Sequence, residues 1–274
     1  MANTILWDNL DRELGFMAKS FPGIAGIAVK PLIGNAFISI NGDEIFPTAS
    51  TIKIHVLTQL LRKAEKGVFN LNDVLDIRKH PLVQGSLITS SLEGPVSLSI
   101  LNLAILMILV SDNLATNICI DLAGIAETNT MIRSLGLPKT TLSRKMQDKA
   151  SIRKNNENIS TPNECITFLE LLKQGQPSPT VAERCISILT KPKTGPLNRA
   201  IPNVPISNKP GTMGRVACDV GIVNLDNYPY YIAIMTKFGM LEALEQTQFL
   251  VDVAKTVHQT MQVIAQTNEF GLAM

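Results

Sequence analysis

The sequence is poor in aromatic residues, with one Trp, three Tyr and nine Phe among 274 residues. Its Lys and Arg residues are scattered, and the formal net charge is only +2. A nucleic-acid-binding surface needs a basic stripe, and single-stranded sites add aromatic side chains for base stacking. The composition therefore argues against a nucleic acid as the partner.

The sequence also lacks a long apolar run. The longest stretch, Leu103 to Val110, is far shorter than the roughly 20 residues that span a bilayer, so we expect a buried core helix and no membrane span. Residues 1–4 show no basic segment leading into an apolar one, as a secretion signal would. We expect either a cytoplasmic protein or an exported one whose signal has been removed.

Four cysteines are present, Cys119, Cys165, Cys185 and Cys218, without a C-x-x-C pair or a His at metal-ligand spacing. This pattern argues against a zinc site, and nothing else in the sequence implies a metal or an organic cofactor. Free thiols behave as small hydrophobic groups, so we expect buried cysteines. If the protein is exported, one disulfide between two of these cysteines is the alternative.

Hydrophobic periodicity places strands near both ends of the chain and helices between them. The expected elements are a helix over 5–19, strands over 24–30 and 36–40, a helix over 50–66, a mostly helical region over 71–189, strands after 205 and a helix over 241–266. Because unpaired strand edges are unfavourable, the terminal strands are predicted to form one antiparallel sheet flanked by the first and last helices. The predicted fold is α+β, with residues 1–48 and 196–274 in this sheet unit and 49–195 in an inserted all-helical subdomain.

Three short motifs follow one another along the chain. Ser50-Thr51-Ile52-Lys53 is S-x-x-K, Ser111-Asp112-Asn113 is S-D-N, and Lys209-Pro210-Gly211-Thr212 is a K-T-G element with proline in place of the hydroxyl residue. This order is typical of serine acyl-transfer enzymes. From about residue 10 to 265 the chain resembles the serine β-lactamase and penicillin-binding-protein superfamily, closest to class A. The resemblance implies the same α+β architecture, with an active site in the cleft between its two parts.

Ser50 is the expected nucleophile. A serine at a helix N-terminus has a favourable dipole and an unused backbone N–H for a substrate oxygen. Lys53, three residues on, lies on nearly the same helix face, where burial and a neighbouring cation would lower its pKa enough to accept the proton of Ser50. The alternative is a helix cap at Ser50 and a solvated charge at Lys53.

The second motif follows the apolar stretch. By resemblance, Ser111 passes a proton from Lys53 or Lys209 to the leaving nitrogen, and Asn113 holds Lys53 and the substrate's amide carbonyl. Asp112 is expected to orient the loop. Ser and Asp are also favoured helix caps, and both roles are compatible.

Two segments compete as the third motif. Lys193-Thr194-Gly195 spells K-T-G in full but lies among prolines, in an expected loop, so we take Lys209, which precedes a strand pattern. Pro210 has no hydroxyl for a substrate carboxylate and no N–H, so it fits only an edge strand.

The third motif would also supply substrate contacts. The N–H of Thr212 is expected to pair with that of Ser50 as an oxyanion hole, beside Gly211. Thr212 and Arg215 are the candidate partners of a substrate carboxylate.

The segment 142–162 departs from class A, whose E-x-x-x-N pattern positions the deacylating water. Counting from Arg144 puts Met146 at the glutamate position, and counting back from Pro162 puts Lys145 there; neither is a carboxylate base. Asp148 and Glu157 are nearby carboxylates outside the pattern.

These residues favour a serine hydrolase that forms an acyl-enzyme at Ser50 from a lactam, amide (peptide) or ester and turns penicillins over slowly. The alternatives are a β-lactamase with a different base, such as Asp148, and a non-catalytic penicillin- or peptide-binding protein. His55, His80 and His258 are expected to be core or surface residues, since His55 points away from Ser50 on its helix. A monomer is expected, and the physiological substrate stays open.

Overall fold

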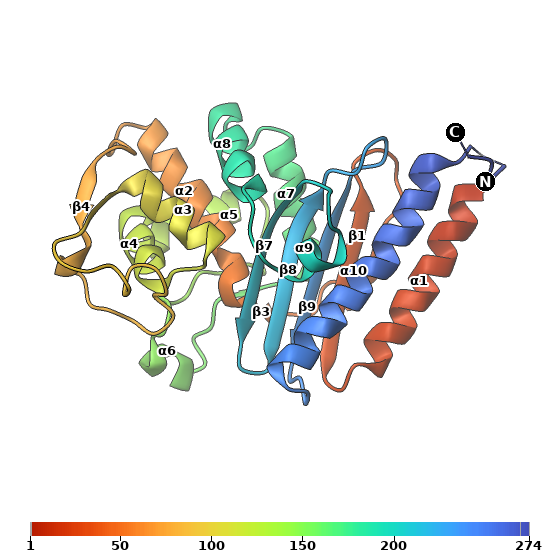
Figure 1. The fold of residues 1–274 in the computed structure, drawn as a ribbon, viewed down its shortest axis with the longest axis horizontal. Helices are drawn as coiled ribbons and strands as arrows, with labels where there is room; N and C mark the ends of the chain where they lie inside the picture. The colour runs from red at the N-terminus through yellow and green to blue at the C-terminus, as the bar shows by residue number, and fades with distance from the viewer. Residues whose placement is uncertain (1, 269, 274) are drawn as a thin grey trace. The chain divides into compact units, whose positions relative to one another are not determined.

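A computed structural model describes residues 2–268 and 270–273. The chain divides into two compact units, residues 1–51, 160–170 and 194–274 in one and residues 52–159 and 171–193 in the other. The elements of the first, the sheet unit, are α1 (Ala2–Ser20), β1 (Ile24–Pro31), β2 (Ile38–Ile40), β3 (Phe46–Pro47), α9 (Pro196–Ala200), β7 (Ile206–Met213), β8 (Val216–Val223), β9 (Tyr230–Lys237) and α10 (Ala243–Gln266). The second, the helical unit, contains α2 (Lys53–Glu65), β4 (Val74–Asp76), η2 (Ile77–Lys79), β5 (Ser97–Ser99), α3 (Ile100–Leu109), α4 (Asn113–Ala123), α5 (Ile125–Ser134), α6 (Lys149–Arg153) and α8 (Pro179–Thr190). Three elements lie where the chain passes between units, η1 (Ala49–Ile52), β6 (Ile159–Ser160) and α7 (Pro162–Lys173) (Figure 1).

The sheet unit is built on one five-stranded sheet with the order β2-β1-β9-β8-β7 and antiparallel pairing. Ile27 of β1 lies opposite Ile234 of β9, so a strand from the start of the chain pairs with one from its end. Every residue of β8 is buried, because both faces of the sheet are covered. The predicted antiparallel sheet from both ends of the chain is confirmed.

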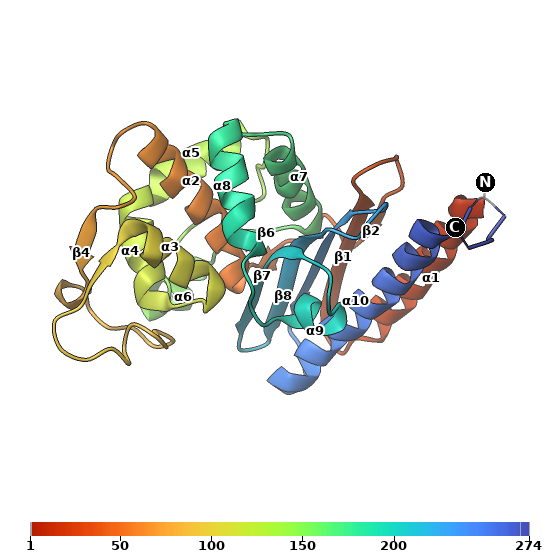
Figure 2. The same cartoon turned by 45° about the horizontal axis from the view of Figure 1, so that its top comes forward.

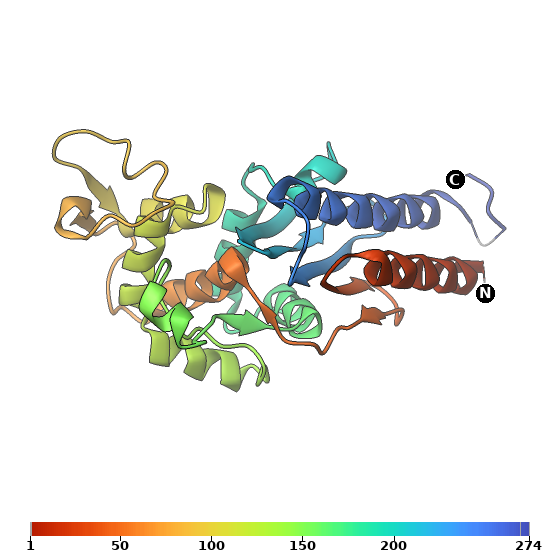
Figure 3. The ribbon, with the colours of Figure 1, turned by 90° about the horizontal axis from the view of Figure 1, so that it is seen from below.

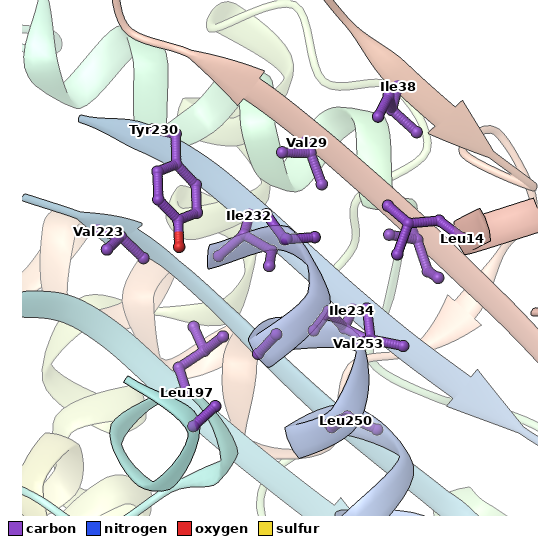
Figure 4. Close-up of a cluster of buried hydrophobic side chains, with 14 of the residues drawn as sticks. Leu14, Val29, Ile38, Leu197, Val223, Tyr230, Ile232, Ile234, Leu250 and Val253 are labelled. Atoms are coloured by element: carbon purple, nitrogen blue, oxygen red, sulfur yellow. The ribbon is translucent and has the colours of Figure 1, made fainter. Parts of the chain in front are cut away.

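Helices α1 and α10 run side by side along one face of the sheet (Figures 1 and 3). Leu14 of α1 and Leu250 and Val253 of α10 have almost no exposed surface and belong to one cluster with Ile232 and Ile234 of β9 (Figure 4). Burying each such side chain contributes about 1.5–3 kcal/mol. The predicted flanking of the sheet by the first and last helices is confirmed.

The helical unit is organised around α2 (Figure 2). The residues of this helix from Lys53 to Leu61 are all buried. The helix ends as predicted at Gly67, which has a φ of +74°. There the Gly67 N–H donates to the Ala64 carbonyl at 2.9 Å and the Val68 N–H to the Lys63 carbonyl at 3.1 Å. This hydrogen-bond pattern is a Schellman motif, which needs a left-handed residue and therefore favours glycine.

Two details differ from the sequence prediction. The inserted unit is not all-helical, because β4 and β5 pair antiparallel and place Leu75 opposite Leu98. Residues 49–51, 160–170 and 194–195 belong to the sheet unit rather than to the helical one. The part of α7 up to Glu170 is held there by an ion pair of 2.6 Å between Glu170 and Lys30 of β1, and Gly26 lets Pro162, at the start of the helix, approach the same strand. Short ladders and packing of this kind leave no periodic signal in a sequence.

All four cysteines are buried and none is in a disulfide in the described part of the chain. Burial raises the pKa of the Cys119 thiol to about 12, so this thiol stays protonated and behaves as an apolar core group. Among residues 2–268 and 270–273, no helix is both long and apolar enough to cross a membrane.

Candidate active site

Ser50 lies in the one-turn 3₁₀ helix η1, which leads directly into α2. The Thr51 N–H and hydroxyl both donate to the Thr48 carbonyl, at 3.0 and 2.8 Å, and fix this turn. Ala49, immediately before Ser50, has a φ of +45°, a left-handed conformation that is unfavourable for a residue with a Cβ. The serine is half-buried. Its turn is therefore held in a strained conformation, and Ser50 precedes the α-helix proper rather than starting it.

Gly211 of β7 touches the backbone of Ser50 within the sheet unit. A Cβ at position 211 would lie 2.6 Å from the Ser50 N and 3.2 Å from both the Ser50 Cα and the Ala49 Cβ. Real Cβ atoms do not approach backbone so closely, so only glycine fits. The strand thus passes directly against the amide of the predicted nucleophile.

The position of β7 at the sheet edge explains how proline is tolerated in it. Pro210 lies opposite Asp219 and Thr212 opposite Ala217. The Ala217 N–H donates to the Thr236 hydroxyl of β9 at 3.0 Å, away from β7. Two residues directly opposite each other in an antiparallel pair point their N–H groups either both toward each other or both away. Because the Ala217 N–H points away from β7, the Thr212 N–H points away from β8, toward the open edge of the sheet. Pro210, two residues earlier, sits where no sheet hydrogen bond is lost, and its predicted edge position is confirmed.

Lys209 is 1% exposed, and its amine donates to the Pro210 carbonyl at 2.7 Å. The Thr212 side chain is exposed, as is that of Arg215 in the turn after β7. The Arg215 guanidinium donates to the Gly239 carbonyl at 2.8 Å, and this contact ties the turn to the segment after β9. Arg215 therefore has a structural contact in addition to its predicted role.

The other half of the predicted machinery lies in the helical unit, around the amine of Lys53. This side chain has 0% exposure. Its Nζ donates to the Ser111 carbonyl at 2.8 Å, to the Ser111 hydroxyl at 2.9 Å and to the Asn113 Oδ1 at 3.2 Å. A buried amine is stable only with such partners, and a solvated surface lysine at this position is excluded.

Ser111 itself has a left-handed φ of +58°. This conformation directs both its carbonyl and its hydroxyl at Lys53. Two hydrogen bonds orient the Asn113 side chain. Its Oδ1 accepts from the Lys53 amine, and its amide nitrogen donates to the Gln84 carbonyl at 2.7 Å. The amide nitrogen of Asn113 therefore points to the loop that contains Gln84.

Asp112 anchors the loop that contains Ile88 and Thr89, in line with the orienting role expected for it. It caps α4 by accepting from the Ala115 N–H at 3.0 Å, and it accepts from the Ile88 and Thr89 N–H groups at 3.1 and 2.9 Å. The Thr89 hydroxyl adds a contact of 2.7 Å. The buried Asp112 carboxylate therefore both caps α4 and orients the loop.

Residues 145–146 lie along α4, on the helix face that carries Asn113. Asn117, one turn beyond Asn113, accepts from the Met146 N–H at 2.8 Å and donates to its carbonyl at 3.2 Å. Asp121, a further turn away, pairs with the Lys145 amine at 2.5 Å. A helix rises about 5.4 Å a turn, so Met146 is held nearer to Asn113 and the Lys145 amine is directed away from it. The sequence carried no signal for the role of Asn117.

The two carboxylates of this segment are engaged locally. Asp148 caps α6, and the Ser151 N–H and hydroxyl that it accepts lower its pKa. Glu157 pairs with Arg144 at 2.6 Å and also accepts from the Asn158 N–H. Both are therefore used to build the loop.

The remaining sequence candidates have structural positions. Lys193 follows α8 in a loop, and its amine donates to the carbonyls of Leu189 and, at 2.8 Å, Lys191. Burial lowers the pKa of His55 to about 3, so it stays neutral. His258 contacts the Tyr230 hydroxyl at 3.1 Å, and burial lowers its pKa. Within the described residues, no group of three or more His, Cys, Asp or Glu could hold a metal ion.

Comparisons with known proteins show the family and the fold. A family model described as the β-lactamase enzyme family matches residues 9–261. The structure of PBP-A is 27% identical over 93% of this chain and 96% of that one, with a TM-score of 0.81, and a mutant of PBP-A has been solved as an acyl-enzyme complex with penicillin G. A β-lactamase of Sphaerobacter thermophilus is 26% identical over 92% and 97% of the two chains, with a TM-score of 0.82.

Curated relatives match over shorter spans. The β-lactamase CARB-4 of Pseudomonas aeruginosa is 26% identical over 64% of this chain and 64% of its own length. A β-lactamase of Proteus vulgaris is 32% identical over 49% of this chain and 46% of its own. The chain thus spans about half to two thirds of these relatives. The family model, which covers most of the chain, and the solved structures with the same fold show that this protein belongs to the β-lactamase enzyme family.

Proposed function

We propose that this protein is a serine hydrolase that forms an acyl-enzyme at Ser50 from a lactam, amide or ester and that turns penicillins over slowly. The observation that carries the proposal is the buried Lys53 amine, hydrogen-bonded at 2.9 Å to the hydroxyl of Ser111. An amine held against a hydroxyl in this way is placed to exchange protons with it.

In the proposed acylation, the Ser50 hydroxyl oxygen attacks the substrate carbonyl carbon, and Lys53, in its neutral form with two N–H donors and a lone pair, accepts the Ser50 proton. The proton passes from Lys53 through the Ser111 hydroxyl to the leaving nitrogen as the C–N bond breaks. The hydrogen bond from Lys53 to Ser111 is the first link of this path. Lys209 would stabilise the substrate's negative charge on the side of β7.

The carbonyl oxygen becomes negative during the attack and needs donors already in position. The backbone N–H groups of Ser50 and Thr212 are proposed for this role. Gly211 supports it, because its missing side chain lets β7 approach the Ser50 amide. Removing one such donor costs about 10²–10³ in rate in other hydrolases.

Slow deacylation follows from the segment 142–162. Its carboxylates, Asp148 and Glu157, accept hydrogen bonds from Ser151 and Arg144 respectively, and the residue held to the Asn113 face of α4 is Met146. A thioether cannot take a proton from water, so the acyl-enzyme would lack the general base that contributes about 10²–10⁴ in rate.

The test is intact-protein mass spectrometry over time after mixing with a penicillin and a cephalosporin, with Ser50→Ala alongside. The expected result is a persistent adduct of the drug's mass that is absent in the variant. Rapid loss of drug with only a transient adduct would establish a β-lactamase with another base. If the drug forms no adduct with the wild type and still binds Ser50→Ala, the protein is a non-catalytic binding protein and the proposal is wrong.

A further inference from the structure

A cavity of about 590 Å³ lies in the sheet unit, between α1 and the β1–β2 hairpin. Its lining includes Ile38 and Ser39 of β2, so within this unit it is separate from Ser50 and Gly211. Strand β2 lies at the sheet edge opposite β7 (Figure 2). Its volume is in the range of small-molecule sites, about 300–1,000 Å³. Nothing in the proposed acyl transfer uses it.

Aromatic side chains form part of its wall. Trp7, the sole tryptophan of the sequence, donates its indole N–H to the Tyr228 hydroxyl at 3.3 Å, and both rings line the cavity. Phe37 lines it as well and is 46% exposed. Ile38, 3% exposed, adds an apolar side chain. Such a wall suits an apolar body, and aromatic faces also attract cations.

All charged residues that line the cavity are acidic. Asp8 and Asp11 lie one helical turn apart on α1, both exposed. Among the described residues, no ion pair or side-chain hydrogen bond involves either carboxylate. The nearest cation in sequence, Arg12, does not line the cavity; its guanidinium donates to the Asp8 carbonyl and the Asn9 side chain. The site therefore offers negative charge without a cation of its own.

We propose that this cavity binds a small organic cation, an ammonium group carried on a short apolar body. The two carboxylates supply the counter-charge, and the aromatic wall supplies dispersion and cation–π attraction. A neutral ligand of the same shape gains only the apolar contacts, and an anion is repelled by Asp8 and Asp11. The charge of the ligand is thus what the site discriminates.

Trp7 makes binding directly measurable, because it is the only tryptophan and it lines the cavity. The probe is choline, and its neutral control is 3,3-dimethylbutan-1-ol, in which carbon replaces the ammonium nitrogen. Tryptophan emission is titrated with each at low ionic strength. We expect a saturable change with choline at millimolar concentration and an at least fivefold weaker response to the alcohol. Equal responses, or none with choline, would overturn the proposal.

Variants locate the site. Asp8→Asn and Asp11→Asn are each expected to weaken choline binding about two- to fivefold, the size of a partly exposed charge pair, and the double variant about tenfold. Glu13→Gln removes an acidic residue of the same helix that does not line the cavity and should change nothing. Choline affinity that is identical in the double variant and the wild type, with both folded by circular dichroism, would contradict the assignment.

Discussion

Replacing Gly211 by alanine would separate β7 from the amide of Ser50. The added Cβ would lie 2.6 Å from the Ser50 N, whereas ordinary contact begins near 3.4 Å. The strand or the turn must therefore move by roughly 0.8 Å, the difference between these distances. The obstructing atoms are backbone, so no side-chain rotation can relieve the contact.

The displacement is large for an oxyanion hole. Its donors must lie 2.7–3.1 Å from the developing negative charge, and misplacement by about 1 Å can cost roughly 10²-fold in rate. We expect Gly211→Ala to form the Ser50 adduct at least about 100-fold more slowly than the wild type. Overpacking should also lower the free energy of unfolding by about 1–3 kcal/mol.

The assay is the rate of adduct formation by mass spectrometry, with urea unfolding of the same samples. Gly214→Ala is the matched control in the β7–β8 turn, because a Cβ there meets nothing within 4 Å although its φ is +52°. It should lose about 1–2 kcal/mol from the left-handed conformation and keep its acylation rate. Acylation by Gly211→Ala within threefold of the wild type would refute the reasoning.

Three further predictions concern deacylation, pH and the loop anchor. Met146→Glu should shorten the lifetime of the acyl-enzyme at least about tenfold by adding a general base, whereas Lys145→Glu, whose position faces Asp121, should not; equal lifetimes in mass spectrometry would disprove the assignment. His55 has a folded pKa of about 3 against an unfolded 6.5, so the unfolded chain binds more protons and stability present above pH 6.5 is lost as pH falls. Urea unfolding should show a contribution of about 2 kcal/mol disappearing between pH 7 and 5, and His55→Leu should flatten this slope. Asp112→Asn should cost roughly 3 kcal/mol, because two or more of its donors lose a charged acceptor; a loss no larger than that of the half-buried Asp148→Asn would contradict the anchoring role.

The sequence predicts the sheet unit well because its signals are strong and local. Runs such as 216–223 and 230–237 are mostly apolar, and Gly67 follows α2 where the periodicity stops. Pro210 even predicts the edge position of β7, because a residue without an N–H has few places in a sheet. Each of these inferences depends on one residue type and one backbone rule.

The parts that the sequence does not predict depend on tertiary contacts. Asn117 holds Met146 across 29 residues, and Asp112 holds Thr89 across 23. Neither an asparagine within a helix nor an aspartate at a helix cap indicates in the sequence that it has a distant backbone partner. The division of α7 between the two units likewise follows from packing around Glu170 rather than from any break in its helical pattern.

Backbone strain links the two halves of the proposed machinery. Ala49 and Ser111, with φ values of +45° and +58°, hold left-handed conformations although neither is glycine. Each costs of order 1–3 kcal/mol and persists only where surrounding contacts impose it. Strain at Ala49 orients the Ser50 amide toward the approach of Gly211, and strain at Ser111 aims two oxygens at Lys53. Other non-glycine residues also have left-handed φ values, so it is the placement of these two, next to Ser50 and at the Lys53 amine, that supports the role proposed for each.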